Sequence, residues 1–432
     1  MSEAEILERM RADWNGRAAE DANYYVAFGR RNQHDEEFFA SAADVVHLLE
    51  AELRRLALPP REASALEIGC GPGRLMRPLS RHFREIHGVD VSDEMIRLAA
   101  DNLRGIPTAR VSRTDGANLA CFADESFDFV YSYAVFQHIP SRDVVLSYLA
   151  EAHRVLRPEG ILRCQINGLS VTAARYTTWE GVRIQAEEIE AFARERDFQL
   201  LALEGAGTQY MWTTLRKKRN GWRRSLDSRS QEHAVAVIRN ITSAYSEEPA
   251  IPASGPLAAA SLWIENMPED ADLAELSVDV GDMKARLTYL GPPDSAAVSQ
   301  LNLLLPSGIR TGLVPMALRW LKHPMAAGWM RVIPACPLVP HICSVTDGVD
   351  LLSEKRFVSR SAKVVIEEVP YPEQFGARLS GRPVEGAESF CADPLARRYE
   401  FNFRVPDGLR GACELVISLG GRRFAPIQVE VE

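Results

Sequence analysis

Apolar positions in the first half of the chain follow two spacings. Short runs in which most residues are apolar predict buried strands, and they fall at residues 64–68, 85–91, 109–112, 127–134 and 161–166. Between these runs, apolar side chains recur every three to four residues, which predicts helices with one buried face. Regular alternation of strands and helices favours a parallel sheet covered on both faces.

The pattern changes after two further strands, at residues 198–204 and 210–216, which have no helix between them. Residues 231–245 have helical spacing, and E-P-A-I-P-A-S-G-P at 248–256 has the composition of a linker. From there to the end, short alternating strands and turns dominate, and no long helix is indicated.

Two strings recur in this second half. L-W-I-E-N-M-P at 262–268 is similar to V-V-I-E-E-V-P at 364–370, and L-P-S-G-I-R-T-G at 305–312 is similar to V-P-D-G-L-R-G-A at 405–412. Offsets of 102 and 100 residues indicate an internal repeat. Repeats of this length fit two tandem β-sandwiches of immunoglobulin-like size.

These patterns predict a multidomain chain of 432 residues, with an α/β Rossmann-like domain followed by two all-β sandwich domains. The predicted boundaries are an α/β domain at 1–218, a helical and proline-rich linker at 219–256, and two repeats at 257–340 and 341–432. We expect residues 1–247 to fold without the rest.

Composition and charge narrow the class of protein. The net charge of −9 argues against a nucleic-acid partner, and we interpret the basic run R-K-K-R-N-G-W-R-R at 216–224 as a solvated face. The start of the chain lacks the apolar core of a signal peptide, and no run reaches the about 18 apolar residues of a membrane helix. We therefore expect a cytoplasmic protein without membrane contact.

The seven cysteines are odd in number and form no C-x-x-C pair, so the sequence indicates neither a disulfide framework nor a metal site. We expect them to act as small buried hydrophobic residues. They are Cys70, Cys121, Cys164, Cys336, Cys343, Cys391 and Cys413.

The stretch A-L-E-I-G-C-G-P-G-R-L at 65–75 carries the most specific chemistry. It places Gly69, Gly71 and Gly73 on alternate residues after a strand, with Arg74 where a dinucleotide-binding G-x-G-x-x-G motif needs glycine. The G-K-[ST] of a P-loop is also absent. An acidic residue followed by G-x-G-x-G at a strand-to-helix turn resembles the first motif of class I S-adenosylmethionine-dependent methyltransferases.

The resemblance extends in order over residues 40–216, and it implies an antiparallel final pair of strands. In that family an acid at the position of Asp90 accepts hydrogen bonds from both ribose hydroxyls, and Glu67 would face the ammonium group of the ligand. Val91 and Met95 would flank the adenine, and Asp115 would accept its amino proton. The cofactor residues implied are Glu67, Gly69, Cys70, Gly71, Gly73, Asp90, Val91, Met95, Asp115, Gly116 and Tyr133. Each residue also has a structural alternative, such as a tight turn or a helix cap.

The resemblance implies in-line methyl transfer from S-adenosyl-L-methionine, with S-adenosyl-L-homocysteine as product, to an unidentified small-molecule, sugar or acyl acceptor. The sequence has Y-S-Y-A at 131–134 in place of the [DN]-P-P-[FY] of methylases acting on adenine or glutamine amide nitrogen. His138 is the candidate general base, which is needed only if the acceptor loses a proton. Tyr133 is a second catalytic candidate and is expected on the same rim of the site. The alternative for His138 is a positioning or packing role.

Two segments are candidates for shaping the acceptor pocket, one near the N-terminus and one after the fifth strand, with simple packing as the alternative. The substrate-binding candidates are Trp14, Arg17, Tyr24, Tyr25, Gln137, Arg175, Tyr176 and Trp179. The β-domains show no catalytic constellation and could present a protein or polymer partner. The open alternatives are a methyltransferase acting on a macromolecule that the β-domains recruit, and a catalytically silent scaffold that binds the cofactor.

Overall fold

The structure is a computed structural model that describes residues 2–27, 31–171, 176–226, 235–335, 338–393 and 396–432. Its contacts divide the chain into two compact units. The first comprises Met1–Ala19 and Ala42–Cys336, and the second comprises Glu20–Ser41 and Pro337–Glu432. We describe each unit by itself.

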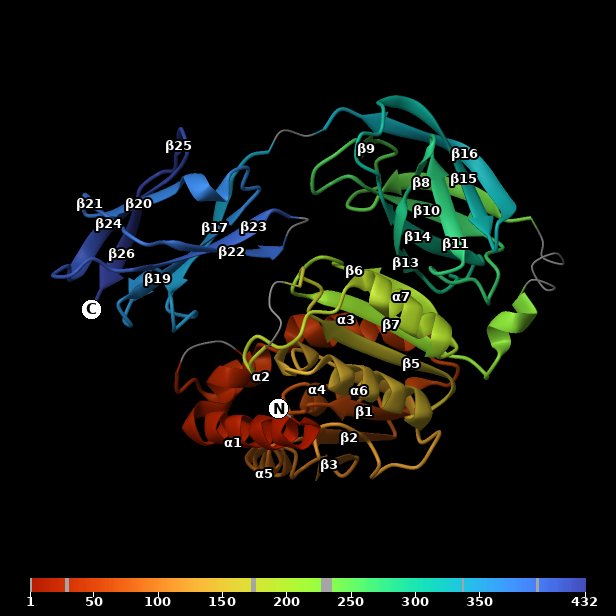
Figure 1. The fold of residues 1–432 in the computed structure, drawn as a ribbon, viewed down its shortest axis with the longest axis horizontal. Coiled ribbons are helices and arrows are strands. Elements are labelled where there is room, and N and C mark those ends of the chain that lie inside the picture. The colour runs from red at the N-terminus through yellow and green to blue at the C-terminus, as the bar shows by residue number, and fades with distance from the viewer. Residues whose placement is uncertain (1, 28–30, 172–175, 227–234, 336–337, 394–395) are drawn as a thin grey trace. The chain divides into compact units, whose positions relative to one another are not determined.

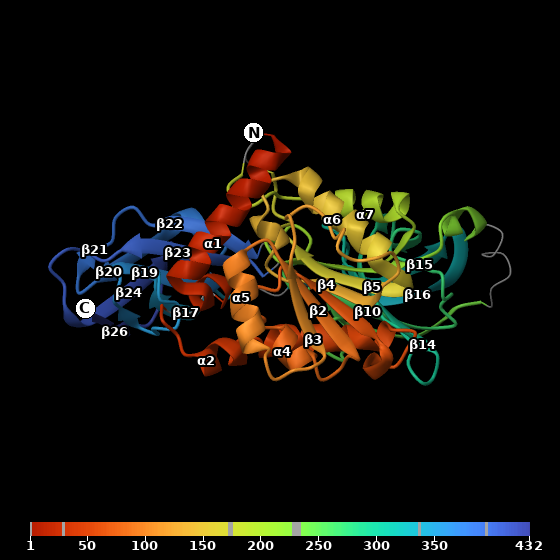
Figure 2. The same cartoon turned by 90° about the horizontal axis from the view of Figure 1, so that it is seen from below.

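The first part of unit 1 is a Rossmann-like α/β fold (Figures 1 and 2). Its strands run in the order β3-β2-β1-β4-β5-β7-β6, in which β3 to β5 are parallel neighbours and β7 is antiparallel to both β5 and β6. The bounds are β1 (Ser64–Ile68), β2 (Glu85–Asp90), β3 (Ala109–Arg113), β4 (Phe127–Ser132), β5 (Leu156–Ile166), β6 (Phe198–Glu204) and β7 (Met211–Lys217). The mostly parallel sheet and its antiparallel end confirm the prediction for this part of the chain.

Helices lie between these strands, and the central strands β1 and β4 are buried along their whole length because both faces of the sheet are covered. Ser92 caps α5 as its residue type predicts, since its Oγ accepts a hydrogen bond from the Met95 backbone N–H at 3.1 Å. The helices of this unit are α3 (Ala43–Glu52), α4 (Met76–Leu79), α5 (Asp93–Asn102), α6 (Arg142–Val155) and α7 (Ala186–Glu195). Helix α1 (Glu3–Ala27) belongs to this unit up to Ala19, and its remainder and α2 (Asp35–Ala40) are assigned to the second unit. No helix in the described ranges is both long enough and apolar enough to cross a membrane.

The sheet does not end at β6. Ala202 of β6 pairs with Tyr289 of β13, so four further strands in the order β13-β14-β10-β8 extend it to eleven. A second sheet of the same unit has the order β12-β11-β15-β16-β9. The bounds are β8 (Val237–Ser243), β9 (Ile251–Pro252), β10 (Ala259–Glu265), β11 (Leu276–Val280), β12 (Met283–Lys284), β13 (Arg286–Leu290), β14 (Val298–Leu304), β15 (Gly312–Trp320) and β16 (His323–Ile333).

Within the predicted helical and proline-rich linker at 219–256, Trp222–Ser225 form a short 3-10 helix, but two further segments are paired into sheets. Residues 237–243 form β8, which pairs antiparallel with β10, and Ile251–Pro252 forms β9, which pairs with β16. The segment V-I-R-N-I-T-S contains three β-branched apolar residues, and pairing with a distant strand decided its conformation over its helical spacing. Residues 231–234 of the expected helix lie outside the described residues.

The second unit contains two sheets, with orders β17-β19-β23-β22 and β18-β26-β24-β20-β21. Side chains from both sheets form one buried cluster that includes Phe357, Val364, Phe401, Leu415 and Ile417. The bounds are β17 (His341–Asp347), β18 (Arg356–Phe357), β19 (Ser361–Glu367), β20 (Phe375–Leu379), β21 (Arg382–Pro383), β22 (Glu388–Asp393), β23 (Arg398–Arg404), β24 (Gly411–Leu419), β25 (Arg422–Arg423) and β26 (Ile427–Val431).

The two β-rich regions have matching strand orders. The order β13-β14-β10-β8 matches β22-β23-β19-β17, and β12-β11-β15-β16-β9 matches β21-β20-β24-β26-β18. Ala259 at the start of β10 and Ser361 at the start of β19 are 102 residues apart, the same offset as in the repeated sequence strings. This common topology agrees with the internal repeat.

Candidate active site

The glycine turn after β1 approaches two neighbouring elements closely. The backbone N–H groups of Gly69 and Cys70 both donate to the Val89 carbonyl oxygen, at 2.8 and 2.9 Å. Gly69 has φ of 74°, and a Cβ built there would lie 2.3 Å from Cγ2 of Val135. Other residues rarely adopt a positive φ, and their Cβ would clash with Val135. Only glycine therefore suits this position.

Asp90 stands at the carboxyl end of β2, beside this turn. One carboxylate oxygen accepts a hydrogen bond from the Gly71 backbone N–H at 2.9 Å, and the other accepts from the Ser92 N–H at 2.9 Å. Burial raises the pKa of Asp90 above its ordinary value, and these two N–H groups oppose that shift. Each oxygen keeps a second lone pair, so the oriented carboxylate can still accept two hydroxyl donors.

Glu67 lies in the interior at the end of β1. Its carboxyl accepts a hydrogen bond from the Tyr131 hydroxyl at 2.9 Å. Burial raises the pKa of Glu67 to about 8, while Tyr131 and the nearby Arg74 guanidinium act in the opposite direction. Such a carboxyl is mostly neutral at pH 7 and becomes a carboxylate most readily when a cation arrives.

Other predicted cofactor residues are buried or closely packed against their neighbours. Cys70 is buried, and burial raises the pKa of its thiol. A Cβ on Gly73 would lie 3.2 Å from Leu103, and one on Gly116 would lie 3.0 Å from Val91, so both glycines allow close packing. Met95 is buried on α5.

Asp115 closes the turn that follows β3. Its Oδ1 accepts hydrogen bonds from the backbone N–H groups of Ala117 at 2.9 Å and Asn118 at 3.1 Å. The carboxylate is exposed, so it can still accept a further donor.

His138 is buried, and both of its ring nitrogens have neighbours. Nδ1 lies 2.8 Å from the Trp179 carbonyl oxygen, and Nε2 lies 3.3 Å from Nε2 of Gln137. Because a carbonyl only accepts, this assigns the ring proton to Nδ1 and leaves Nε2 facing an amide donor. Burial lowers the pKa of His138 to about 4, so the ring is neutral at pH 7. This geometry favours positioning over proton abstraction.

A cluster of aromatic and cationic side chains lies around His138. The guanidinium carbon of Arg17 is 4.7 Å from the ring centroid of Trp14 and 5.1 Å from that of Trp179. Arg17 also donates to the carbonyl oxygen of Thr178 at 3.2 Å and to its hydroxyl at 3.1 Å. The Trp14 ring meets His138 edge-on, with centroids 5.5 Å apart. The structure thus brings together the N-terminal helix and the loop after β5, as the sequence predicts.

The remaining predicted site residues that the structure describes have neighbours outside the cluster around His138. The ring of Tyr133 stacks on Trp212 at 5.5 Å, and Tyr176 lies 5.9 Å from the Arg183 guanidinium. Tyr24 and Tyr25 belong to the second unit, where they pack against Arg31 at 4.0 and 5.0 Å. Arg175 lies outside the described residues.

Two residues of this region were not predicted. Gln165 is fully buried, and its amide nitrogen donates to Gln137 Oε1 at 3.1 Å and to the Gln209 carbonyl at 2.8 Å. Arg74 is also buried, 5.9 Å from the Tyr133 ring. A polar residue inside the apolar run I-L-R-C-Q-I was the available signal for Gln165, because a strand interior excludes unpaired amides.

Comparison with known proteins identifies a methyltransferase domain in this part of the chain. The family described as "Methyltransferase domain" matches residues 66–164. The chain is 30% identical over 128 residues to the 2-methyl-6-phytyl-1,4-hydroquinone methyltransferase of Synechocystis sp., with 29% of this chain and 39% of the relative covered. It is 31% identical over 107 residues to a ubiquinone biosynthesis O-methyltransferase of Cereibacter sphaeroides, with 25% and 42% covered. The chain therefore spans about two fifths of the length of these two relatives.

A solved structure, phosphoethanolamine N-methyltransferase 1 of Haemonchus contortus in complex with phosphoethanolamine and S-adenosylhomocysteine, is also similar. Its sequence identity is 17%, its TM-score is 0.37, and 51% of each chain is covered.

Proposed function

We propose that this chain, whose residues 66–164 form a methyltransferase domain of the S-adenosylmethionine-dependent class, transfers a methyl group to a small-molecule, sugar or acyl acceptor. The observation that carries the proposal is the Asp90 carboxylate, which the Gly71 and Ser92 N–H groups orient beside a turn that only glycine can form. A carboxylate that keeps free lone pairs, beside a turn whose backbone approaches closely, can accept hydrogen bonds from the hydroxyls of a ribose. The acceptor class rests on the relatives and on the absent [DN]-P-P-[FY] motif.

The residues present fit this cofactor. When bound, S-adenosylmethionine supplies a methyl group already activated on a sulfonium, so the protein mainly aligns the acceptor and excludes water. Asp90 would hold the ribose hydroxyls, and Glu67 would pair with the ammonium group. The Trp14, Arg17 and Trp179 side chains would enclose the acceptor side.

The transfer is an in-line displacement. The acceptor atom forms a bond to the methyl carbon, the carbon–sulfur bond breaks, and its electron pair stays on sulfur in S-adenosylhomocysteine. We assign His138 a positioning role, because Trp179 and Gln137 occupy its two ring nitrogens. A proton lost by the acceptor would then not pass to this imidazole.

The test is calorimetric titration of S-adenosylmethionine and S-adenosylhomocysteine into the full chain and into an Asp90→Asn variant. We expect the substitution to weaken binding by at least about tenfold, because it removes the charged acceptor of two hydroxyl donors. Asp93→Asn is the matched control, since Asp93 lies three residues away on α5 and pairs with Arg11 on the surface. Equal affinity of Asp90→Asn and the parent chain, with both folded, would refute the placement of the site.

A second candidate function is methylation of a polymer that the β-rich part recruits. It rests on a cleft of about 400 Å³ in the first β-region. The cleft is lined mostly by neutral polar side chains, with one tryptophan and one carboxylate, and the lining includes Asn240, Thr242, Glu247, Trp263 and Gln300. Planar amides and an indole suit a neutral polymer such as a glycan, and a pair of immunoglobulin-like sandwiches would be a suitable carrier. Trp263→Ala would then reduce methylation of a polymeric acceptor and leave cofactor affinity unchanged. Cofactor binding without transfer to any tested acceptor would favour the silent scaffold instead.

A further inference from the structure

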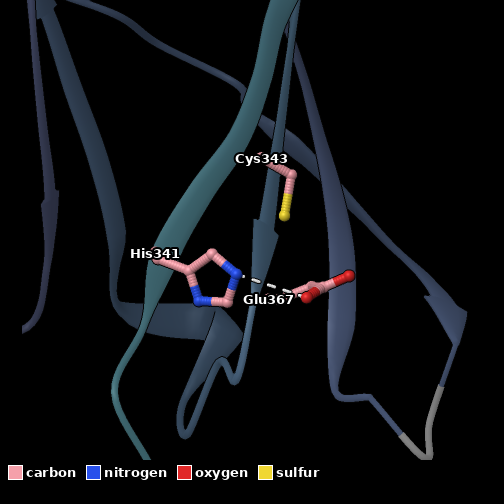
Figure 3. A group of neighbouring side chains, drawn as sticks. All are labelled: His341, Cys343 and Glu367. Atoms are coloured by element: carbon pink, nitrogen blue, oxygen red, sulfur yellow. Dashed lines mark ion pairs between the residues drawn. The ribbon is translucent and has the colours of Figure 1, made fainter.

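A mixed group of side chains lies on one sheet of the second unit, on strands with no part in the proposed methyl transfer. His341 and Cys343 come from β17, and Glu367 comes from the neighbouring strand β19. One ligand atom from each residue lies within 4.8 Å of the other two. Figure 3 shows the imidazole, the thiol and the carboxylate directed toward one another.

Strand geometry explains why they meet. His341 pairs directly with Glu367, so their side chains stand side by side on one face of the sheet. The register shifts between Ile342 and Ser344, which leaves Cys343 without a paired residue on β19. His341 and Cys343 are two residues apart on β17, so strand alternation puts both side chains on one face of the sheet, next to Glu367.

The distances suit a tetrahedral metal ion. Nε2 of His341 lies 3.3 Å from Oε2 of Glu367. Two ligands at zinc bond lengths of about 2.0–2.1 Å, separated by a tetrahedral angle, stand about 3.3 Å apart. The thiol sulfur lies within 4.8 Å of both atoms. It would move closer to them to become the third ligand, and water would fill the fourth position. Imidazole, thiolate and carboxylate together favour Zn²⁺ over Mg²⁺ or Ca²⁺, which prefer oxygen ligands.

A further residue supports the carboxylate. Arg398 of β23 donates from Nε to Oε1 of Glu367 at 2.8 Å, which leaves Oε2 facing His341. Outer-shell partners of this kind fix the orientation of metal ligands. We propose that His341, Cys343 and Glu367 form a zinc-binding site on the second unit, with one position open to water.

The test uses the full chain, stripped with a chelator and titrated with Zn²⁺ in a calorimeter. We expect one equivalent of zinc to bind with micromolar affinity or tighter. His341→Ala, Cys343→Ser and Glu367→Gln should each weaken this binding at least about tenfold, because each removes one of three protein ligands. Cys391→Ser is the matched control, since Cys391 lies on β22 of the same sheet and outside the group.

Cobalt provides a second readout that identifies the ligands. Co²⁺ bound by a thiolate gives a charge-transfer band in the near ultraviolet, which should appear in the parent chain and in Cys391→Ser but not in Cys343→Ser. Circular dichroism checks that each variant is folded, which we expect because His341 and Cys343 are exposed. Absence of zinc binding, or equal binding by the three ligand variants and the control, would overturn the proposal. Cofactor titration is a separate measurement, so failure of either proposal is recognised independently.

Discussion

Glu67 is the residue whose chemistry depends most on its surroundings. An exposed glutamate is charged at pH 7, whereas here burial between β1 and β4 raises the pKa to about 8. The Tyr131 hydroxyl and Arg74 reduce the shift but do not cancel it. The site therefore holds a carboxyl that is mostly uncharged until a cationic ligand stabilises its ionised form.

This pKa predicts how stability changes with pH. The folded chain binds a proton at Glu67 up to about pH 8, while the unfolded chain releases it near pH 4.5, so the folded state binds more protons between these values. The free energy of unfolding therefore falls as pH rises through this window. Glu67→Gln should remove this contribution and raise the stability at pH 8 relative to the parent, on the order of a few kcal/mol.

Urea unfolding of both chains at pH 5 and pH 8, without ligand, measures this difference. Glu94→Gln is the control, because Glu94 is paired with Arg97 at the surface of α5. A stability difference between Glu67→Gln and the parent that is the same at both pH values would show that Glu67 titrates normally.

At the scale of elements, the edge of β6 is the junction that organises unit 1. Gln199 of β6 donates to the carbonyl oxygens of Glu269 and Ala271 at 2.9 and 2.7 Å. Arg223, which follows β7, forms an ion pair with Asp272 at 2.8 Å, and Asp272 is fully buried. The junction therefore combines backbone pairing with a buried charge pair.

Removing one charge of this pair should destabilise the unit strongly. Asp272→Asn leaves Glu275, at 2.9 Å, as the carboxylate partner of the Arg223 guanidinium. We expect the loss of the buried charge-assisted bond to lower the unfolding free energy by about 2 kcal/mol. Glu269→Gln is the matched control, because only its backbone takes part in the junction and its side chain is exposed. Chemical denaturation measures both variants, and equal midpoints would show that the ion pair does not stabilise the junction.

At the scale of the whole molecule, the α/β fold and the first β-region share one eleven-stranded sheet. This shared sheet bears on the expectation that residues 1–247 fold alone. A chain ending there lacks β13 and residues 269–272, so it exposes the edge of β6 and leaves Arg223 without Asp272. An exposed edge strand promotes aggregation.

We expect the 1–247 fragment to be less soluble and to unfold at a lower temperature than a 1–335 fragment, which retains β8 to β16. Size-exclusion chromatography and differential scanning fluorimetry of the two fragments test this. If both fragments are monomeric and melt at the same temperature, residues 1–247 fold without the first β-region, as the sequence predicts.

The sequence by itself determined the local features. The alternating spacings predicted β1 to β7, Ser92 was correctly expected to cap α5, and the glycine turn and Asp90 fall where their motif places them. These features depend on residues close together in the chain, so periodicity and turn chemistry are sufficient to find them.

Only the tertiary structure decided the rest. Burial set the neutral states of Glu67 and His138, and pairing with β10 made a strand of a segment with helical spacing. The His341, Cys343 and Glu367 group follows no C-x-x-C spacing, because its members meet through strand register and the alternation of side chains along β17. The physical reason is common to all of these: solvent exclusion and strand pairing involve residues far apart in the sequence, and local patterns carry no information about which distant residues will meet.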